Sequence, residues 1–278
     1  MVRVKHFKTF LAFAALTLGL SFYSCSSDDD GPDDSTTNAP LVGKWEVSNQ
    51  NAEYGSFEFT GDQKYIITQR TTIPTEGSRS VTRAGETYII VIFGDYSTKS
   101  TEGNEYKLDL KEFGTIVISI TESGATITVN GEMYDVSKAP EVAITDRTKL
   151  LCHTWNLDKA REYVPSDEEA PEYIFIGNGE TITFTNNGTY VQYNANLTEE
   201  QKEYDGIPDY EYGTWKWIDS KTLEMSYNGY LSGHRVETRL ARYTVTEFTN
   251  NKLTLECIVE FEPEEYDPED EYTMWLSR

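Results

Sequence analysis

The sequence predicts an all-β protein built from two small domains in tandem. Three observations support this prediction. Short runs of alternating apolar and polar residues recur along the chain, separated by turn-forming pairs such as Asn130-Gly131. The composition favours strands, with 19 tyrosines and 12 phenylalanines among 278 residues. Finally, the second half of the chain repeats short motifs of the first half in the same order.

The N-terminal segment, residues 1–24, has the order of a secretion signal. Basic residues precede an apolar run from Phe10 to Leu20, which is shorter than the roughly 20 residues that a membrane-spanning helix needs. The segment Phe22–Cys25 then resembles a lipobox, in which the signal is cut before a cysteine that receives acyl chains. We therefore expect a signal peptide over residues 1–24 and lipid attachment at Cys25. An ordinary signal peptide that ends near a cysteine is the alternative.

Residues 25–40 follow as an acidic, turn-rich segment. The stretch from Ser26 to Asp34 holds almost no apolar residue, so we expect a flexible tether. This stretch resembles the acidic signal that directs lipoproteins of Bacteroidetes-type bacteria to the cell surface. The resemblance implies an outer-membrane lipoprotein, exposed at the cell surface, whose membrane partner is reached through acyl chains on Cys25.

The charge of the chain excludes some partners. Removing residues 1–24 takes away three of the 24 Lys and Arg residues and none of the 47 Asp and Glu residues, so the net charge falls from −23 to −26. Nucleic acids are bound mainly by Lys and Arg that neutralise phosphates, so a nucleic-acid partner is not expected. A basic patch that binds an anionic membrane is not expected either.

The first domain is predicted over residues 41–137. Its clearest part is a three-stranded meander from Gly114 to Val136, with turns at Ser123-Gly124 and Asn130-Gly131. Residues 138–147 contain a proline and several polar residues and break the alternating pattern. We place the domain boundary in this stretch.

The second domain is predicted over residues 148–278. Strands resume at Trp155, and three long strands close the domain, over Arg235–Phe248, Lys252–Glu262 and Glu271–Leu276. One short helix is expected at Thr198–Gln201, where the spacing of Thr and Gln is that of a capping box.

The two predicted domains share three segments in the same order. The paired segments are Leu41–Trp45 with Leu150–Trp155, Phe59–Tyr65 with Phe184–Tyr190, and Phe93–Tyr96 with Tyr212–Trp215. Matches in a common order favour a duplicated unit.

This order of motifs resembles the lipocalin-like domains of Bacteroides-type lipoproteins. The resemblance implies two tandem antiparallel β-barrels, with Trp45 and Trp155 each closing one end of a barrel. In many lipocalins a basic residue packs on that tryptophan, and Arg278 is the candidate in the second domain. His153 stands where the family has glycine. The alternative fold is a pair of immunoglobulin-like sandwiches, in which the buried tryptophan lies on an inner strand instead of opening the domain.

The sequence predicts no catalytic residue, no metal site and no cofactor. The mature chain has two histidines, His153 and His234, and they do not form a metal-spaced pair. The sequence also lacks a nucleophile elbow and a phosphate-binding loop. An exported protein permits a disulfide between Cys152 and Cys257, but the alternating pattern around Cys257 favours two buried thiols.

The candidate ligand-binding residues lie in a tyrosine-rich segment that ends at Tyr212. Tyr204, Tyr210 and Tyr212 could stack on a sugar ring or cover a pocket at a barrel mouth, with simple packing as the alternative. The resemblance implies a non-catalytic binding module for a small apolar or glycan ligand. A structural or partner-binding surface subunit with filled barrels is the second hypothesis, and an enzyme is the third.

Overall fold

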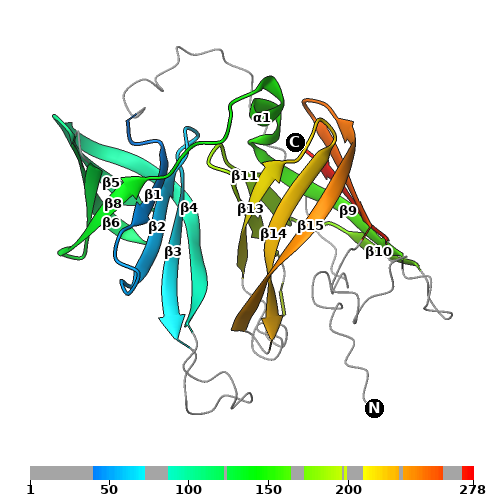
Figure 1. The fold of residues 1–278 in the computed structure, drawn as a ribbon, viewed down its shortest axis with the longest axis horizontal. Coiled ribbons are helices and arrows are strands. Elements are labelled where there is room, and N and C mark those ends of the chain that lie inside the picture. Colours follow the sequence, from blue (N-terminus) through cyan, green and yellow to red (C-terminus); the bar gives the residue numbers. More distant parts are fainter. Residues whose placement is uncertain are drawn as a thin grey trace, which may run out of the picture.

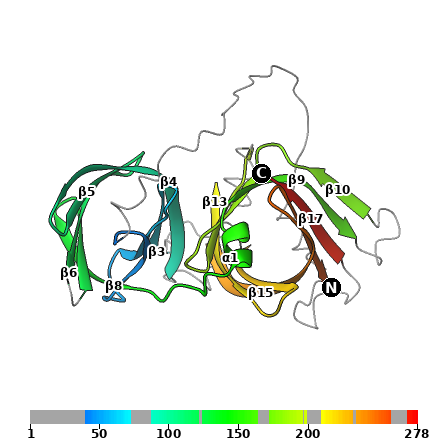
Figure 2. The same ribbon diagram turned by 90° about the horizontal axis from the view of Figure 1, so that it is seen from above.

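The computed structural model describes residues 40–72, 87–121, 124–163, 172–195, 197–198, 209–231, 234–258 and 271–278. The predicted signal peptide, Cys25 and nearly all of the tether therefore lie outside the described residues, as does most of the expected helix at Thr198–Gln201. Two β-barrels stand side by side (Figures 1 and 2). The prediction of an all-β fold with two tandem antiparallel barrels is confirmed, and the barrels replace the alternative of two sandwiches.

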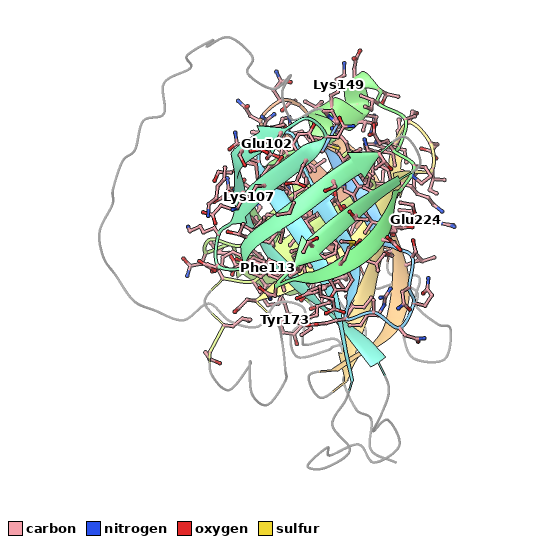
Figure 3. All side chains as sticks on the ribbon, turned by 90° about the vertical axis from the view of Figure 1, so that its left-hand side faces the viewer. Glu102, Lys107, Phe113, Lys149, Tyr173 and Glu224 are labelled. Atoms are coloured by element: carbon pink, nitrogen blue, oxygen red, sulfur yellow. The ribbon has the colours of Figure 1, made fainter. Side chains whose placement is uncertain are left out.

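The first barrel is closed by eight antiparallel strands that pair in sequence order, with β1 also pairing to β8. The strands are β1 (Gly43–Val47), β2 (Tyr54–Phe59), β3 (Lys64–Thr72), β4 (Thr87–Glu102), β5 (Glu105–Leu110), β6 (Gly114–Thr121), β7 (Gly124–Val129) and β8 (Glu132–Lys138). The predicted meander corresponds to β6–β8. Asn130 and Gly131 have φ values of 51° and 86°, which is the left-handed conformation that a tight hairpin turn needs. The outer face turned away from the second barrel carries charged side chains such as Glu102 and Lys107 (Figure 3).

The second barrel is closed through pairing of β9 with β17. Its strands are β9 (Thr154–Tyr163), β10 (Glu172–Ile176), β11 (Thr181–Phe184), β12 (Thr189–Tyr193), β13 (Tyr210–Trp217), β14 (Thr222–Leu231), β15 (His234–Phe248), β16 (Lys252–Ile258) and β17 (Glu271–Ser277). β10 and β11 pair with successive parts of the same edge of β9, so together they fill one position around the barrel.

A short helix that the sequence analysis did not predict precedes the second barrel. Helix α1 (Asp146–Leu151) begins after Thr145, whose hydroxyl accepts a hydrogen bond from the Thr148 N–H at 3.1 Å. This is the usual way in which a threonine satisfies a helix N-terminus. The helix crosses the position at which the second domain was expected to begin, and it lies over one end of the second barrel (Figure 2).

The two barrels close one end with the same arrangement. The indole N–H of Trp45 donates to the Leu41 carbonyl at 2.9 Å, and that of Trp155 donates to the Leu151 carbonyl at 2.9 Å. The expected cation is also present, because the Arg278 guanidinium lies 5.9 Å from the Trp155 ring. In the first barrel Lys138 takes this place, with its amine 5.9 Å from the Trp45 ring.

Candidate functional site

The core of the first barrel is apolar. One continuous cluster of buried side chains fills it, with contributions from all eight strands. Its members include Trp45, Phe57, Phe59, Tyr65 and Leu108, each at most 4% exposed. A barrel of this size is just wide enough to be filled by its own side chains, and the first barrel is filled in this way.

The second barrel has a small apolar cluster around Ala241 and Cys257, and its main apolar core lies near α1. There Trp155, Phe184, Trp215 and Leu255 form the core together with their neighbours. Arg147 of α1 covers this end, with its guanidinium 4.1 Å from the Trp217 ring.

Strand geometry places polar side chains at the opposite end of the second barrel. Alternate residues of a strand point to the same face, so Gln192 and Asn194 share the inward face of the core residue Tyr190. Gln192 pairs in register with Glu211 on β13, which therefore also faces inward. Separated from β12 by one strand position, Glu162 of β9 shares the face of the core residue Ala160.

Three of these polar side chains are buried and hydrogen-bonded to one another. Gln192, Asn194 and Glu211 are only 8%, 8% and 7% exposed. The Gln192 amide donates to Asn194 Oδ1 at 3.0 Å, and the Asn194 amide donates to Glu211 Oε1 at 2.9 Å. Buried polar groups are costly unless they are paired, so the chain of hydrogen bonds explains how this end of the core can be polar.

Tyr272 of β17 belongs to the same region. It pairs in register with Glu162 on one side and with Cys257 on the other. Burial is the main cause that raises the pKa of its hydroxyl above the ordinary value of 10, and the nearby Glu162, Glu211 and Cys257 raise it further. The hydroxyl therefore stays protonated at neutral pH and can both donate and accept a hydrogen bond.

Comparison of the two barrels shows that the fold does not require this polarity. In the first barrel Tyr65 pairs with Gly94, and two residues further along these strands Ile67 pairs with Ile92. In the second barrel Tyr190 pairs with Gly213, and the equivalent next pair is Gln192 with Glu211. Two isoleucines in one copy are thus replaced by an amide and a carboxylate in the other.

Sequence analysis missed these interior residues, although a signal was available. The matched segments Phe59–Tyr65 and Phe184–Tyr190 end two residues before the Ile67 and Gln192 positions. Extending the comparison by those two residues would have exposed the substitution of an isoleucine by a polar residue. Glu162 had no such signal, because its inward orientation depends on a β-bulge in β9, where Leu157 pairs with Leu276 but Lys159 pairs with the next residue, Trp275. Tyr272 shares the face of the core residues Met274 and Leu276 by simple alternation.

The predicted tyrosines occupy a different part of the molecule. Tyr210 and Tyr212 alternate with the inward Glu211, so they lie on the outer face of the second barrel. The Tyr210 ring lies 5.2 Å from that of Tyr193 and 5.6 Å from that of Phe93 in the first barrel. Tyr204 lies outside the described residues. A ligand-binding role for these three tyrosines stays a prediction.

The remaining candidates from the sequence have structural surroundings. Cys152 and Cys257 do not form a disulfide. Burial, helped by Glu58, raises the pKa of the Cys152 thiol to about 12. Burial lowers the pKa of His153, and the nearby Arg278 lowers it further. Among the residues that the structure describes, there is no group of three His, Cys, Asp or Glu side chains arranged to hold a metal ion.

No helix within the described ranges is long and apolar enough to cross a membrane. No protein-family model matches the chain, and no curated protein matches it either. The likeness to lipocalins therefore rests on the two closed eight-position barrels and on their tryptophan-closed ends.

Proposed function

We propose that the chain is a lipid-anchored surface lipoprotein whose second barrel binds a small hydroxyl-rich ligand such as an oligosaccharide. The observation that carries this proposal is the group of buried polar side chains, Gln192, Asn194 and Glu211, in the second barrel's interior. The described residues of the first barrel include no such group of buried, hydrogen-bonded polar side chains in its interior. We assign the ligand to the second barrel alone. The chain is not proposed to be an enzyme, and no metal or cofactor is assigned to it.

The chemistry of the interior favours a glycan over an apolar ligand. Carboxylate, amide and phenol groups together offer both donors and acceptors, which match the hydroxyl groups of a sugar. An apolar ligand would bury Gln192, Asn194 and Glu211 further without offering them a hydrogen bond, and this carries an energetic cost. Aromatic side chains such as Tyr272 add a flat surface on which a sugar ring can lie.

A thermal-shift screen of residues 26–278 tests the proposal. One panel should hold oligosaccharides and the other fatty acids and bile-type amphiphiles. A ligand at 100 times its dissociation constant stabilises the folded state by about 2.7 kcal/mol, which raises the melting temperature by several degrees. We expect such a shift from members of the oligosaccharide panel. A shift from the amphiphiles alone, or from neither panel, would contradict the proposal.

The filled interior of the first barrel favours a second role for that domain, as a structural or partner-binding unit. Mild crosslinking on intact cells, followed by purification of the lipoprotein, would test it. One stoichiometric surface protein captured through the first barrel would support this role, and recovery of the monomer alone would speak against it.

A further inference from the structure

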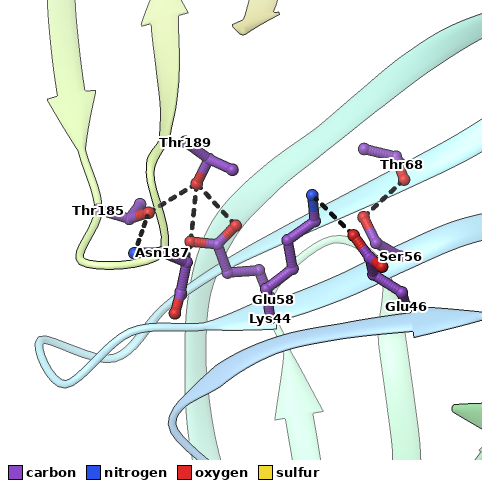
Figure 4. A network of polar contacts seen from close by, with 8 residues as sticks. All are labelled: Lys44, Glu46, Ser56, Glu58, Thr68, Thr185, Asn187 and Thr189. Atoms are coloured by element: carbon purple, nitrogen blue, oxygen red, sulfur yellow. Dashed lines mark hydrogen bonds and ion pairs between the residues drawn. The ribbon is translucent and has the colours of Figure 1, made fainter. Parts of the chain in front are cut away.

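The two barrels contact one another through a buried polar network (Figure 4). Glu58 of β2 points out of the first barrel, yet it is only 1% exposed. Its carboxylate accepts hydrogen bonds from the Thr189 hydroxyl at 2.7 and 2.8 Å and from the Asn187 amide at 2.9 Å. Since the Thr189 proton is directed at Glu58, the Thr185 hydroxyl, 2.6 Å away, is the donor to Thr189. The hydrogen bonds to this carboxylate thus come from residues of the second barrel.

Aromatic and apolar contacts extend this interface along β12 and β13. Phe93 of the first barrel meets the edge of the Tyr210 ring at 5.6 Å, and Tyr210 packs on Tyr193 at 5.2 Å. The Lys44 amine lies 6.0 Å from the Tyr212 ring. Burial lowers the pKa of Lys44, but Tyr212, Glu46 and Glu58 outweigh that effect and raise it above its ordinary value. The lysine therefore keeps its charge in the interface.

The strands that form this interface are the same strands that carry the polar interior. Along β12, Thr189, Val191 and Tyr193 face the first barrel, while Tyr190 and Gln192 face inward. Along β13, Tyr210 and Tyr212 lie on either side of Glu211. Val191 is 1% exposed although it points out of its own barrel, which shows how closely this wall is covered. Each interior polar residue of this wall is therefore a direct chain neighbour of an interface residue.

We propose that the first barrel positions the β12–β13 wall of the second barrel, so that Glu58 and Phe93 are positioning residues for Gln192, Asn194 and Glu211. Removing a buried carboxylate from its hydrogen-bond partners has a high free-energy cost. This cost holds the outer face of the β12–β13 wall in place. A strand cannot shift on one face without moving the side chains on the other. The inference rests on the proposed function for its ligand, but its test does not need a ligand.

The test uses the side-chain amide signals of Gln192 and Asn194 in nuclear magnetic resonance spectra of residues 26–278. The variants are Glu58→Ala, Phe93→Ala and their combination. The matched control is Asp109→Asn, which removes a carboxylate that pairs with Lys99 at 2.8 Å on the first barrel itself. Phe93→Ala leaves Glu58 in place and so decides the question if Glu58→Ala does not fold.

We expect the interface variants to move the Gln192 and Asn194 amide signals and to speed hydrogen exchange at the Gln192 and Glu211 backbone amides by about fivefold or more. The control should change neither. Unchanged interior signals, in a variant whose Thr189 and Tyr210 signals show that the interface has moved, would overturn the proposal. Failure of the oligosaccharide screen would instead remove the proposed ligand and leave this result standing.

Discussion

Glu224 shows how a single charged residue is stabilised on the outer face of the second barrel. It lies on β14 with its side chain 6% exposed, 2.7 Å from the Lys216 amine and 3.0 Å from Arg242 Nε. Hydrogen bonds from Lys216 and Arg242 outweigh the effect of burial and hold its pKa below the ordinary 4.5. The ionised carboxylate therefore bridges three adjacent strands.

Glu224→Gln should lower the free energy of unfolding by about 1 kcal/mol at neutral pH, because both cations are largely exposed and screened by water. The pKa of Glu224 is lower in the folded than in the unfolded state. Its contribution to the free energy of unfolding is therefore fully present above pH 4.5 and is lost as the pH falls through the folded-state pKa. Urea unfolding of both proteins between pH 7 and pH 3 measures this difference. Glu256→Gln, which removes an acceptor of one threonine hydroxyl at 3.0 Å, serves as the control and should change little. A difference that grows on acidification would show that the assignment is wrong.

Cys25 carries the proposed membrane anchor. Cys25→Ala should release the chain from membranes, because several acyl chains anchor a protein firmly and the rest of the mature chain has no predicted anchor. Metabolic labelling with a clickable fatty acid, followed by membrane fractionation, measures both effects. Labelling that persists in the variant, or a variant that stays in the membrane fraction, would contradict lipid attachment at this residue.

At the scale of the strands, the repeat gives matched positions in the two barrels. Gly94 and Gly213 each face a tyrosine across the ladder, yet their surroundings differ. A Cβ at Gly213 would lie 2.0 Å from the Ser226 carbonyl oxygen and 2.4 Å from the Tyr190 ring, whereas one at Gly94 would meet only the Tyr65 ring at 3.0 Å. The contact at Gly94 is with a side chain, whereas the contact at Gly213 includes the Ser226 backbone, which is part of the β13–β14 ladder.

Gly213→Ala should therefore destabilise its barrel by about 3 kcal/mol or more, and Gly94→Ala its own barrel by about 1 kcal/mol. Urea unfolding followed by circular dichroism and tryptophan fluorescence measures both losses. Equal losses in the two variants would show that the backbone near Ser226 relaxes more easily than its hydrogen bonds suggest.

Most strands could be predicted from the sequence, because alternation and turn residues act locally. The meander ending at Val136 and the closing strands from Lys252 and Glu271 begin where the sequence indicated. Two features could not be predicted in this way. Helix α1 has only six residues, too few for a periodic pattern. The interruption between β10 and β11 depends on how both strands share the edge of β9, which is a property of the closed barrel.

The location of the candidate site was harder to predict than the fold. Residue type alone points to Tyr210 and Tyr212 as ligand-binding residues, but alternation with Glu211 turns them toward the first barrel. Which face of β13 is internal is fixed by the register with Tyr190 and by the contact between the barrels. The tyrosine-rich composition of a segment does not show which surface of the protein its side chains cover.

At the scale of the whole molecule, the two barrels share one fold and differ in what fills them. The core of the first is one apolar cluster, whereas the interior of the second carries the buried Gln192, Asn194 and Glu211 as well as apolar clusters. The same closed end, with an indole bonded to a carbonyl and a cation on the ring, serves both. A stable fold thus needs no polar interior, which is why we attribute that interior to ligand binding.

The most direct test of this claim replaces the polar pair by the residues of the other barrel. The double variant Gln192→Ile with Glu211→Ile should still fold, because Ile67 and Ile92 occupy the same register in the first barrel, but it should lose about 1–3 kcal/mol of stability since the buried Asn194 loses its hydrogen bonds with both residues. Calorimetric titration of both proteins with the stabilising oligosaccharides is the measurement. We predict binding to the natural chain and a loss of at least about a hundredfold in affinity for the variant, as expected when two or more buried hydrogen bonds are removed. Equal binding by a folded variant would contradict the account.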